Sequence, residues 1–157
     1  MKIGIISDTH DNVEDVIKAT RLFKKKKVDF VVHCGDMVAP KTINFFKGIK
    51  LEMVLGNCDG DIETIKKNLA NIGGKFLGEV GKFTMEGKRF LVYHGTDKVK
   101  LDKFIKAQRN DYVLTGHTHK VMDKTIGITR VLNPGGHYYK DTGTVMLLTD
   151  MVEVRKL

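Results

Sequence analysis

Five separate apolar segments of this chain are each followed at once by a turn that carries Asp, Asn or His. The five turns are Asp8-Thr9-His10, Gly35-Asp36, Gly56-Asn57, His94-Gly95 and Gly116-His117-Thr118-His119. In open α/β sheets, ligands bind beyond the carboxyl ends of the strands. The sequence therefore favours a fold in which five strand ends meet at one crevice.

The first half of the chain alternates short apolar runs with amphipathic stretches. Strands are expected over residues 2–6, 29–33 and 51–55, and helices over residues 12–26, 40–47 and 61–72. The apolar residues of 12–26 recur at helical spacing, and Pro40 stands in the first turn of the second helix. This βαβαβα order is typical of a parallel sheet covered by helices.

The second half of the chain is richer in strands. Only residues 98–107 read as a helix, and strands are expected over residues 75–77, 82–85, 89–93, 112–114, 121–126, 129–132, 144–148 and 151–155. An α/β half followed by a β-rich half predicts two packed sheets with helices outside. At 157 residues, the chain fits one domain, residues 1–157.

Composition and charge exclude some classes of protein. No stretch approaches the roughly 20 apolar residues of a membrane span, so no membrane partner is expected. The net charge of +8 comes mostly from scattered lysines, which favours a solvated surface over a nucleic-acid platform. With no export signal, Cys34 and Cys58 are expected to be reduced thiols in a cytoplasmic protein.

The histidines carry the functional prediction. Asp and Asn are ordinary turn residues, but five of the six histidines lie within or just past a strand end, and turn chemistry gives no reason for that choice. Imidazole and oxygen ligands without a thiolate pair suit Mn, Fe, Ni, Co or Zn. The candidate ligands are too many for one ion with an open position, and they suit two ions that share a carboxylate. They are Asp8, His10, Asp36, Asn57, His94, His117 and His119.

These five blocks, in this order and spacing, resemble the calcineurin-like metallophosphoesterases over nearly the whole chain. The short length and the block at residues 133–136 resemble the small phosphodiesterase branch, which also contains a retromer subunit. The resemblance implies a four-layer αββα sandwich and two divalent transition metal ions, with Mn or Ni favoured. It implies a water or hydroxide between the ions as nucleophile and Asp36 as their bridge. The implied ligands are Asp8, His10, Asp36 and His119 for one ion, and Asp36, Asn57, His94 and His117 for the other.

One position departs from the family pattern. Many members have His after the Asn of the third block, where it is thought to protonate the leaving group, and this chain has Cys58. We take Cys58 as a buried thiol, which is a poorer proton donor than an imidazolium. Asp36, Asn57, Cys58 and His94 are the candidate catalytic residues. Asp59, without its usual His neighbour, is interpreted as a turn carboxylate.

Several smaller signals have two interpretations each. His33 is either a support for a metal ligand or a structural histidine. His137 and the following Tyr138-Tyr139-Lys140 form either an exposed loop, which is favoured, or part of the substrate cleft. Asn12 either contacts a phosphate or caps the first helix, and the cap is favoured. Cys34 is either a small core residue, which is favoured, or a nucleophile.

The predicted function is hydrolysis of a phosphodiester, with a phosphomonoester as the close variant. The candidate substrates are a cyclic nucleotide or other nucleotide, a small diester and a nucleic-acid end. An idle scaffold of the same fold is the alternative. Scaffold relatives lack one or more of these histidines, whereas this chain keeps all of them, so the enzyme is favoured. A nucleic-acid partner is not favoured, and a homo-oligomer remains open.

Overall fold

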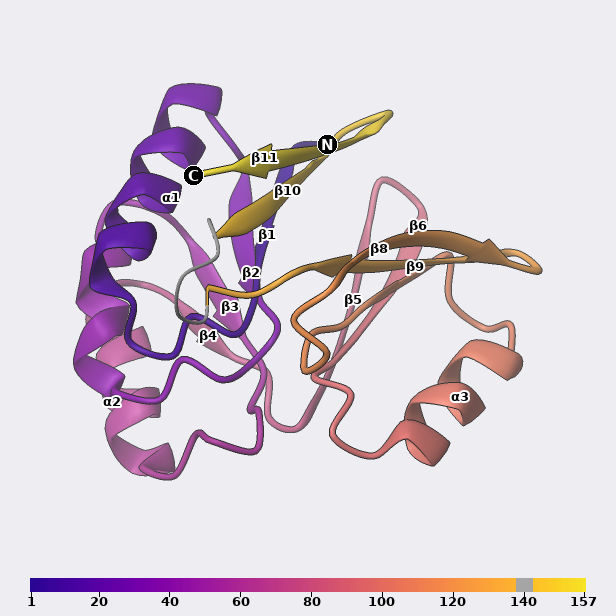
Figure 1. The fold of residues 1–157 in the computed structure, drawn as a ribbon, viewed down its shortest axis with the longest axis horizontal. Coiled ribbons are helices and arrows are strands. Elements are labelled where there is room, and N and C mark those ends of the chain that lie inside the picture. Colours follow the sequence, from indigo (N-terminus) through magenta and orange to yellow (C-terminus); the bar gives the residue numbers. More distant parts are fainter. Residues whose placement is uncertain (138–142) are drawn as a thin grey trace.

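Two mixed sheets form the frame of the protein (Figure 1). The computed structural model describes residues 1–137 and 143–157. The first sheet has six strands in the order β11-β10-β1-β2-β3-β4, of which β1 to β4 are parallel. Its strands are β1 (Ile3–Ile6), β2 (Phe30–His33), β3 (Leu51–Met53), β4 (Lys75–Phe76), β10 (Thr144–Leu148) and β11 (Val152–Lys156).

The second sheet has five strands in the order β5-β6-β7-β9-β8. Strands β6, β7 and β9 are parallel, and the two outer strands pair antiparallel with their neighbours. The strands are β5 (Val80–Met85), β6 (Lys88–Tyr93), β7 (Tyr112–Leu114), β8 (Val121–Ile126) and β9 (Thr129–Pro134).

Helices cover the outer face of each sheet. Figure 1 shows α1 (Val13–Lys26) and α2 (Ile62–Asn71) beside the first sheet, and α3 (Lys98–Lys106) beyond the second. The helix expected at residues 40–47 is a 3-10 helix, η1 (Pro40–Phe46), in which the Lys47 N–H donates to the Asn44 carbonyl three residues earlier. At seven residues it is longer than most 3-10 helices, which rarely run beyond about 3–4 residues.

Alternation along the strands fills three apolar layers. In β2, Val31 belongs to the core beneath the helices of the first sheet, whereas Val32 belongs to the core between the sheets. In β6, Val92 faces the other sheet and Leu91 packs towards α3. Successive side chains of a strand point to opposite faces, so each strand serves two layers. The predicted four-layer αββα architecture is confirmed.

Helix α1 shows how the sequence fixes these elements. Its apolar residues Val16, Ala19 and Phe23 recur at helical spacing and are buried. The Asn12 side chain accepts a hydrogen bond from the Asp15 N–H at 3.1 Å, so the expected cap is confirmed. None of the helices in the described part of the chain is long and apolar enough to cross a membrane.

The loops at the carboxyl ends of the parallel strands are joined by backbone hydrogen bonds. The Asp8 N–H donates to the Gly35 carbonyl at 3.0 Å, and the Gly116 N–H donates to the His94 carbonyl at 2.9 Å. Between the sheets, the His117 N–H donates to an Asp8 carboxylate oxygen at 3.0 Å. Loops from both sheets therefore meet at one end of the sandwich.

Candidate metal centre

Most of the predicted ligands lie on strained backbone. Non-glycine residues with positive φ are uncommon, and they persist where the surrounding structure holds them. Five predicted ligands have this conformation, with φ between 40° and 65°: Asp8, His10, Asp36, His117 and His119. The strained turns direct side chains from different strands towards one point.

Two glycines allow the loops to come this close. A Cβ at Gly56 would collide with the Asp36 carboxylate, and a Cβ at Gly116 would collide with the Ser7 hydroxyl and lie 2.6 Å from an Asp8 carboxylate oxygen. Any side chain at either position would push the loops apart. The glycines of the third and fifth blocks are therefore needed for packing at the site.

Four predicted ligands converge on one point. His119 Nε2 lies 3.2 Å from Asp8 Oδ1 and 3.3 Å from His10 Nε2. His10 Nε2 lies 3.7 Å from Asp36 Oδ2. Asp8, His10 and His119 each offer one ligand atom within 4.8 Å of the others. This group matches the first ligand set implied by the resemblance.

His94 joins the same carboxylates from the other side. Its Nδ1 lies 2.8 Å from the Cys34 carbonyl oxygen, so the ring donates there and its orientation is fixed. Its Nε2 lies 3.3 Å from Asp36 Oδ2 and 3.9 Å from Asp8 Oδ1. This nitrogen is buried and has no hydrogen bond to any described residue. Nε2 therefore points to a position beside both carboxylates.

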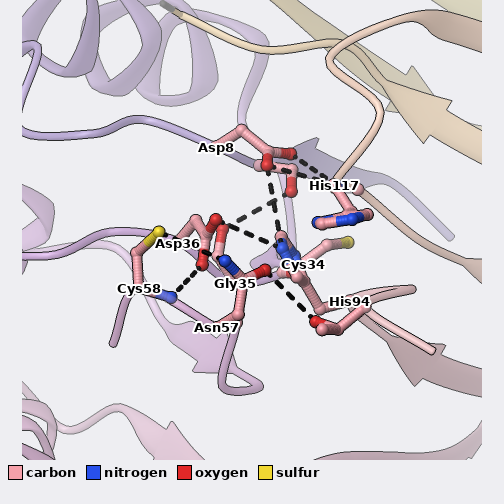
Figure 2. A network of polar contacts seen from close by, with 12 residues as sticks. Asp8, Cys34, Gly35, Asp36, Asn57, Cys58, His94 and His117 are labelled. Carbon is pink, nitrogen blue, oxygen red and sulfur yellow. Dashed lines mark hydrogen bonds and ion pairs between the residues drawn. The ribbon is translucent and has the colours of Figure 1, made fainter. Parts of the chain in front are cut away.

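Asn57 and His117 stand at the edge of this group (Figure 2). The His117 ring is packed edge-to-face on the His94 ring, with centroids 5.2 Å apart. The Asn57 Oδ1 accepts from the Thr96 hydroxyl at 3.3 Å. In the described part of the chain, no polar contact joins either side chain to Asp36. Both residues are exposed, and the loops bring them beside the site without a direct contact to the shared carboxylate.

Asp36 and His94 shift each other's pKa. Burial alone raises the pKa of Asp36, but the His94 imidazole and the Cys58 N–H, which donates at 2.8 Å, hold the pKa well below its usual range. Burial lowers the pKa of His94, and the Asp36 and Asp8 carboxylates more than offset it, so that the pKa is raised. The site therefore attracts positive charge, as a cation site should.

Cys58 differs from the expectation of a buried thiol, because its side chain is exposed. Partial desolvation raises its pKa, and the negative charge of Asp36 raises it further. Asn57 Nδ2 donates to the sulfur at 3.3 Å. The Cys58 backbone N–H faces the Asp36 carboxylate, while the side chain lies on the exposed side. Cys58 is thus a protonated thiol at the rim of the site.

Asp59 is more than the turn carboxylate that the sequence indicated. Its side chain is buried and accepts four backbone N–H bonds, from Asp36 and Gly56 at 2.8 Å and from Met37 and Val38 at 2.9 Å. It ties the loop after β2 to the loop after β3. Sequence reasoning missed this role, since the only local signal was an Asp three residues after a turn glycine.

His33 supports the site without entering it. It is fully buried, its Nε2 lies 3.1 Å from the Thr9 hydroxyl, and its Nδ1 accepts from the Gly35 N–H at 3.2 Å. Burial lowers the pKa of His33 to about 3, so the ring is neutral. It therefore fixes the two loops that carry Asp8 and Asp36. Cys34 is buried in the core between the sheets, as predicted.

His137 is not the exposed loop residue that the sequence favoured. Its side chain is buried, with Nδ1 3.2 Å from Asp15 Oδ2 in helix α1. Its backbone N–H donates to the Asp8 carbonyl at 3.0 Å. The partner Asp15 is remote in sequence, which explains why no local pattern indicated this pairing. The neighbouring Tyr138, Tyr139 and Lys140 lie outside the described residues.

The residues present fit divalent ions. Two carboxylates and three imidazoles meet within contact distance, and one buried imidazole nitrogen has no hydrogen-bond partner among the described residues. Oxygen and imidazole donors of this kind suit divalent transition metals. Asp36 lies between the His10 and His94 rings, and Asp8 lies between His119 and His94. Each carboxylate therefore lies beside His94 and beside one histidine of the first ligand set.

Known structures share this fold. The solved structure of an archaeal phosphodiesterase superposes with a TM-score of 0.94 at 30% identity and covers 100% of both chains. The Vacuolar Protein Sorting 29 protein of Cryptosporidium parvum shares the fold, with a TM-score of 0.73 at 18% identity over 99% of this chain and 91% of that chain.

Comparison of the sequence with known proteins also finds phosphoesterases. A phosphodiesterase of Methanocaldococcus jannaschii is 33% identical over 138 residues, which cover 86% of this chain and 83% of that protein. The family model described as the calcineurin-like phosphoesterase superfamily domain matches residues 1–153. This chain is therefore a member of the calcineurin-like phosphoesterase superfamily.

Proposed function

We propose that this protein is a phosphodiesterase that works with two divalent metal ions. The observation that carries the proposal is the position of the Asp36 carboxylate. Its Oδ2 lies 3.7 Å from His10 Nε2 on one side and 3.3 Å from His94 Nε2 on the other. A carboxylate shared by two groups of imidazoles is the feature expected of a paired metal site.

In this proposal, the two ligand sets share Asp36. The first set is Asp8, His10, Asp36 and His119, and the second is Asp36, Asn57, His94 and His117. Bound divalent ions would polarise the phosphoryl oxygens and lower the pKa of water. Mn or Ni is our first choice of metal.

The protein's own groups hold this arrangement in place. Asp59 fixes the backbone around Asp36 through four N–H bonds, and the Cys34 carbonyl fixes the His94 ring. Preorganised groups need no rearrangement during the reaction. The exposed Cys58 thiol lies beside Asn57 and is a weak proton donor because its pKa is raised. The enzyme should therefore prefer esters whose leaving group needs no proton.

The sequence and structure comparisons both support a diester substrate. Each finds an archaeal protein named a phosphodiesterase, at 33% identity in the sequence comparison and at 30% in the structure comparison. The scaffold alternative has less support. The likeness to Vacuolar Protein Sorting 29, at 18% identity, concerns the fold alone, and this chain keeps every predicted ligand.

A substrate panel tests the proposal. Chelated protein is reloaded with Mn, Ni, Fe, Co or Zn and assayed on p-nitrophenyl phosphate and on bis(p-nitrophenyl) phosphate. We expect metal-dependent cleavage, faster for the diester, and none with Asp36→Asn. Asp61→Asn is the matched control, because Asp61 is an exposed helix cap near the site loop. Equal activity in Asp36→Asn, or no cleavage with any ion, would overturn the proposal.

A further inference from the structure

A cavity of about 500 Å³ lies beside the metal centre, between α3 and the second sheet. At one end it is lined by the loop residues Gly116, His117 and Thr118, which belong to the fifth block. From there it runs between helix and sheet as far as Ile126, near the end of β8. The cavity is therefore continuous with the predicted ligand His117.

The walls of this cavity are mainly apolar. Leu101 and Ile105 contribute from α3, and Met122, Ile126 and Val131 from β8 and β9. Protein interiors are close-packed, so an apolar space of this size beside a reactive centre is typical of a ligand site. Its volume falls within the range of about 300–1,000 Å³ for small-molecule pockets.

Polar side chains in the wall near the centre are already engaged within the protein. The Thr115 hydroxyl donates to the His94 carbonyl at 2.9 Å. Asn133 Nδ2 donates to the Gly116 carbonyl at 2.7 Å, and its Oδ1 accepts from the Gly135 N–H at 2.9 Å. The donor groups of these side chains are already hydrogen-bonded within the protein and do not bind a polar ligand. A ligand in this part of the cavity would be held by apolar contact.

We propose that this cavity binds one uncharged, apolar organic arm of the ester while the phosphoryl group lies at the metal centre. The inference rests on the proposed phosphoesterase function and specifies its substrate class. The arm has room for at least an aromatic ring. The exposed residues Lys98 and Lys124 also line the cavity, together with the carboxylate of Asp102, and the excess of positive charge favours the approach of an anionic ester.

Successive side chains of β8 point to opposite faces of the sheet, so the strand offers variants that fill the cavity and a matched control that does not. Met122, Lys124 and Ile126 line the cavity, whereas the exposed Thr125 does not and belongs to the other face of the strand. Met122 pairs with Asn133 and is nearer to the centre, and Ile126 is at the far end. Met122→Trp and Ile126→Trp should each fill part of the cavity. Thr125→Trp adds the same ring outside it.

The test compares methylphosphonate and phenylphosphonate, which share the phosphonate group and differ only in the arm. Binding to metal-loaded protein is measured by calorimetry. In the wild type we expect the phenyl compound to bind at least about tenfold more tightly, since small apolar increments in such pockets are worth about 10–200-fold. Thr125→Trp should keep this preference. Met122→Trp and Ile126→Trp should reduce it towards one.

Methylphosphonate has only a methyl group as its arm, so its binding measures the affinity of the metal centre alone. If it binds and the phenyl compound binds no better, the cavity inference is wrong and the proposed function stands. If neither compound binds, the proposed function fails and the inference fails with it. If Met122→Trp also loses methylphosphonate, its ring has disturbed the centre and Ile126→Trp decides. A phenyl preference that persists in both filling variants would overturn the inference, and so would one that persists in Ile126→Trp where Met122→Trp has lost methylphosphonate.

Discussion

Replacing Asp59 by Ala tests how the site is held together. The side chain is buried and accepts four backbone N–H bonds at 2.8–2.9 Å. The substitution leaves four donors without their acceptor, at about 1–3 kcal/mol each when buried. Water entering the space and relaxation of the loops reduce that sum. We expect a loss of about 3–5 kcal/mol in the free energy of unfolding of the metal-free protein.

Denaturant unfolding in the presence of a chelator measures this loss. Asp61→Ala is the matched control, because Asp61 accepts one N–H bond, from Thr64 at 3.1 Å, at an exposed helix cap. The control should cost about 0.5–2 kcal/mol. Asp59→Ala should also weaken metal binding, since two of the lost bonds come from Asp36 and Gly56. If the two variants unfold alike and bind metal alike, Asp59 does not organise the site.

Three further predictions concern single residues. Cys58→His should speed alkyl diesters more than aryl ones, by up to the factor of about 10²–10⁴ that a general acid contributes; parallel leaving-group slopes for the two proteins would contradict this. His33 has a folded pKa of about 3 against an ordinary 6.5, so its contribution to stability is complete above pH 6.5 and is lost as the pH falls towards 3. In that window the free energy of unfolding should fall more steeply with falling pH in the wild type than in His33→Gln, by about 1.4 kcal/mol per pH unit. Denaturant curves in chelator measure the two slopes, and equal slopes would refute the assignment. A thiol reagent should modify the exposed Cys58 in the native protein and the buried Cys34 only after unfolding, whereas finding no thiol in unreduced, unfolded protein would mean a disulfide.

The layers and the position of the site could be predicted because they follow from local patterns. Apolar alternation assigns strands such as β2 and β6 to two packed layers each. A ligand-type residue directly after such a strand must lie at its carboxyl end. Asp36 and His94 could therefore be placed at one crevice without knowing the order of strands in either sheet.

The supporting contacts could not be predicted in this way. The role of Asp59 depends on the left-handed turn at Asp36, which brings successive N–H groups round to one carboxylate. The burial of His137 depends on Asp15, which is remote in sequence. The apolar cavity depends on where α3 lies against β8 and β9. Each of these features is set by packing between distant segments.

Anomalous scattering from crystals soaked in Mn or Ni tests the central claim most directly. The residues around Asp36 offer carboxylate and imidazole atoms on two sides of one carboxylate. The account predicts two peaks, about 3.5–4 Å apart, with Asp36 between them. One peak should lie beside His10 and His119, and the other beside His94. A single peak at full metal loading, or two peaks away from Asp36, would contradict it.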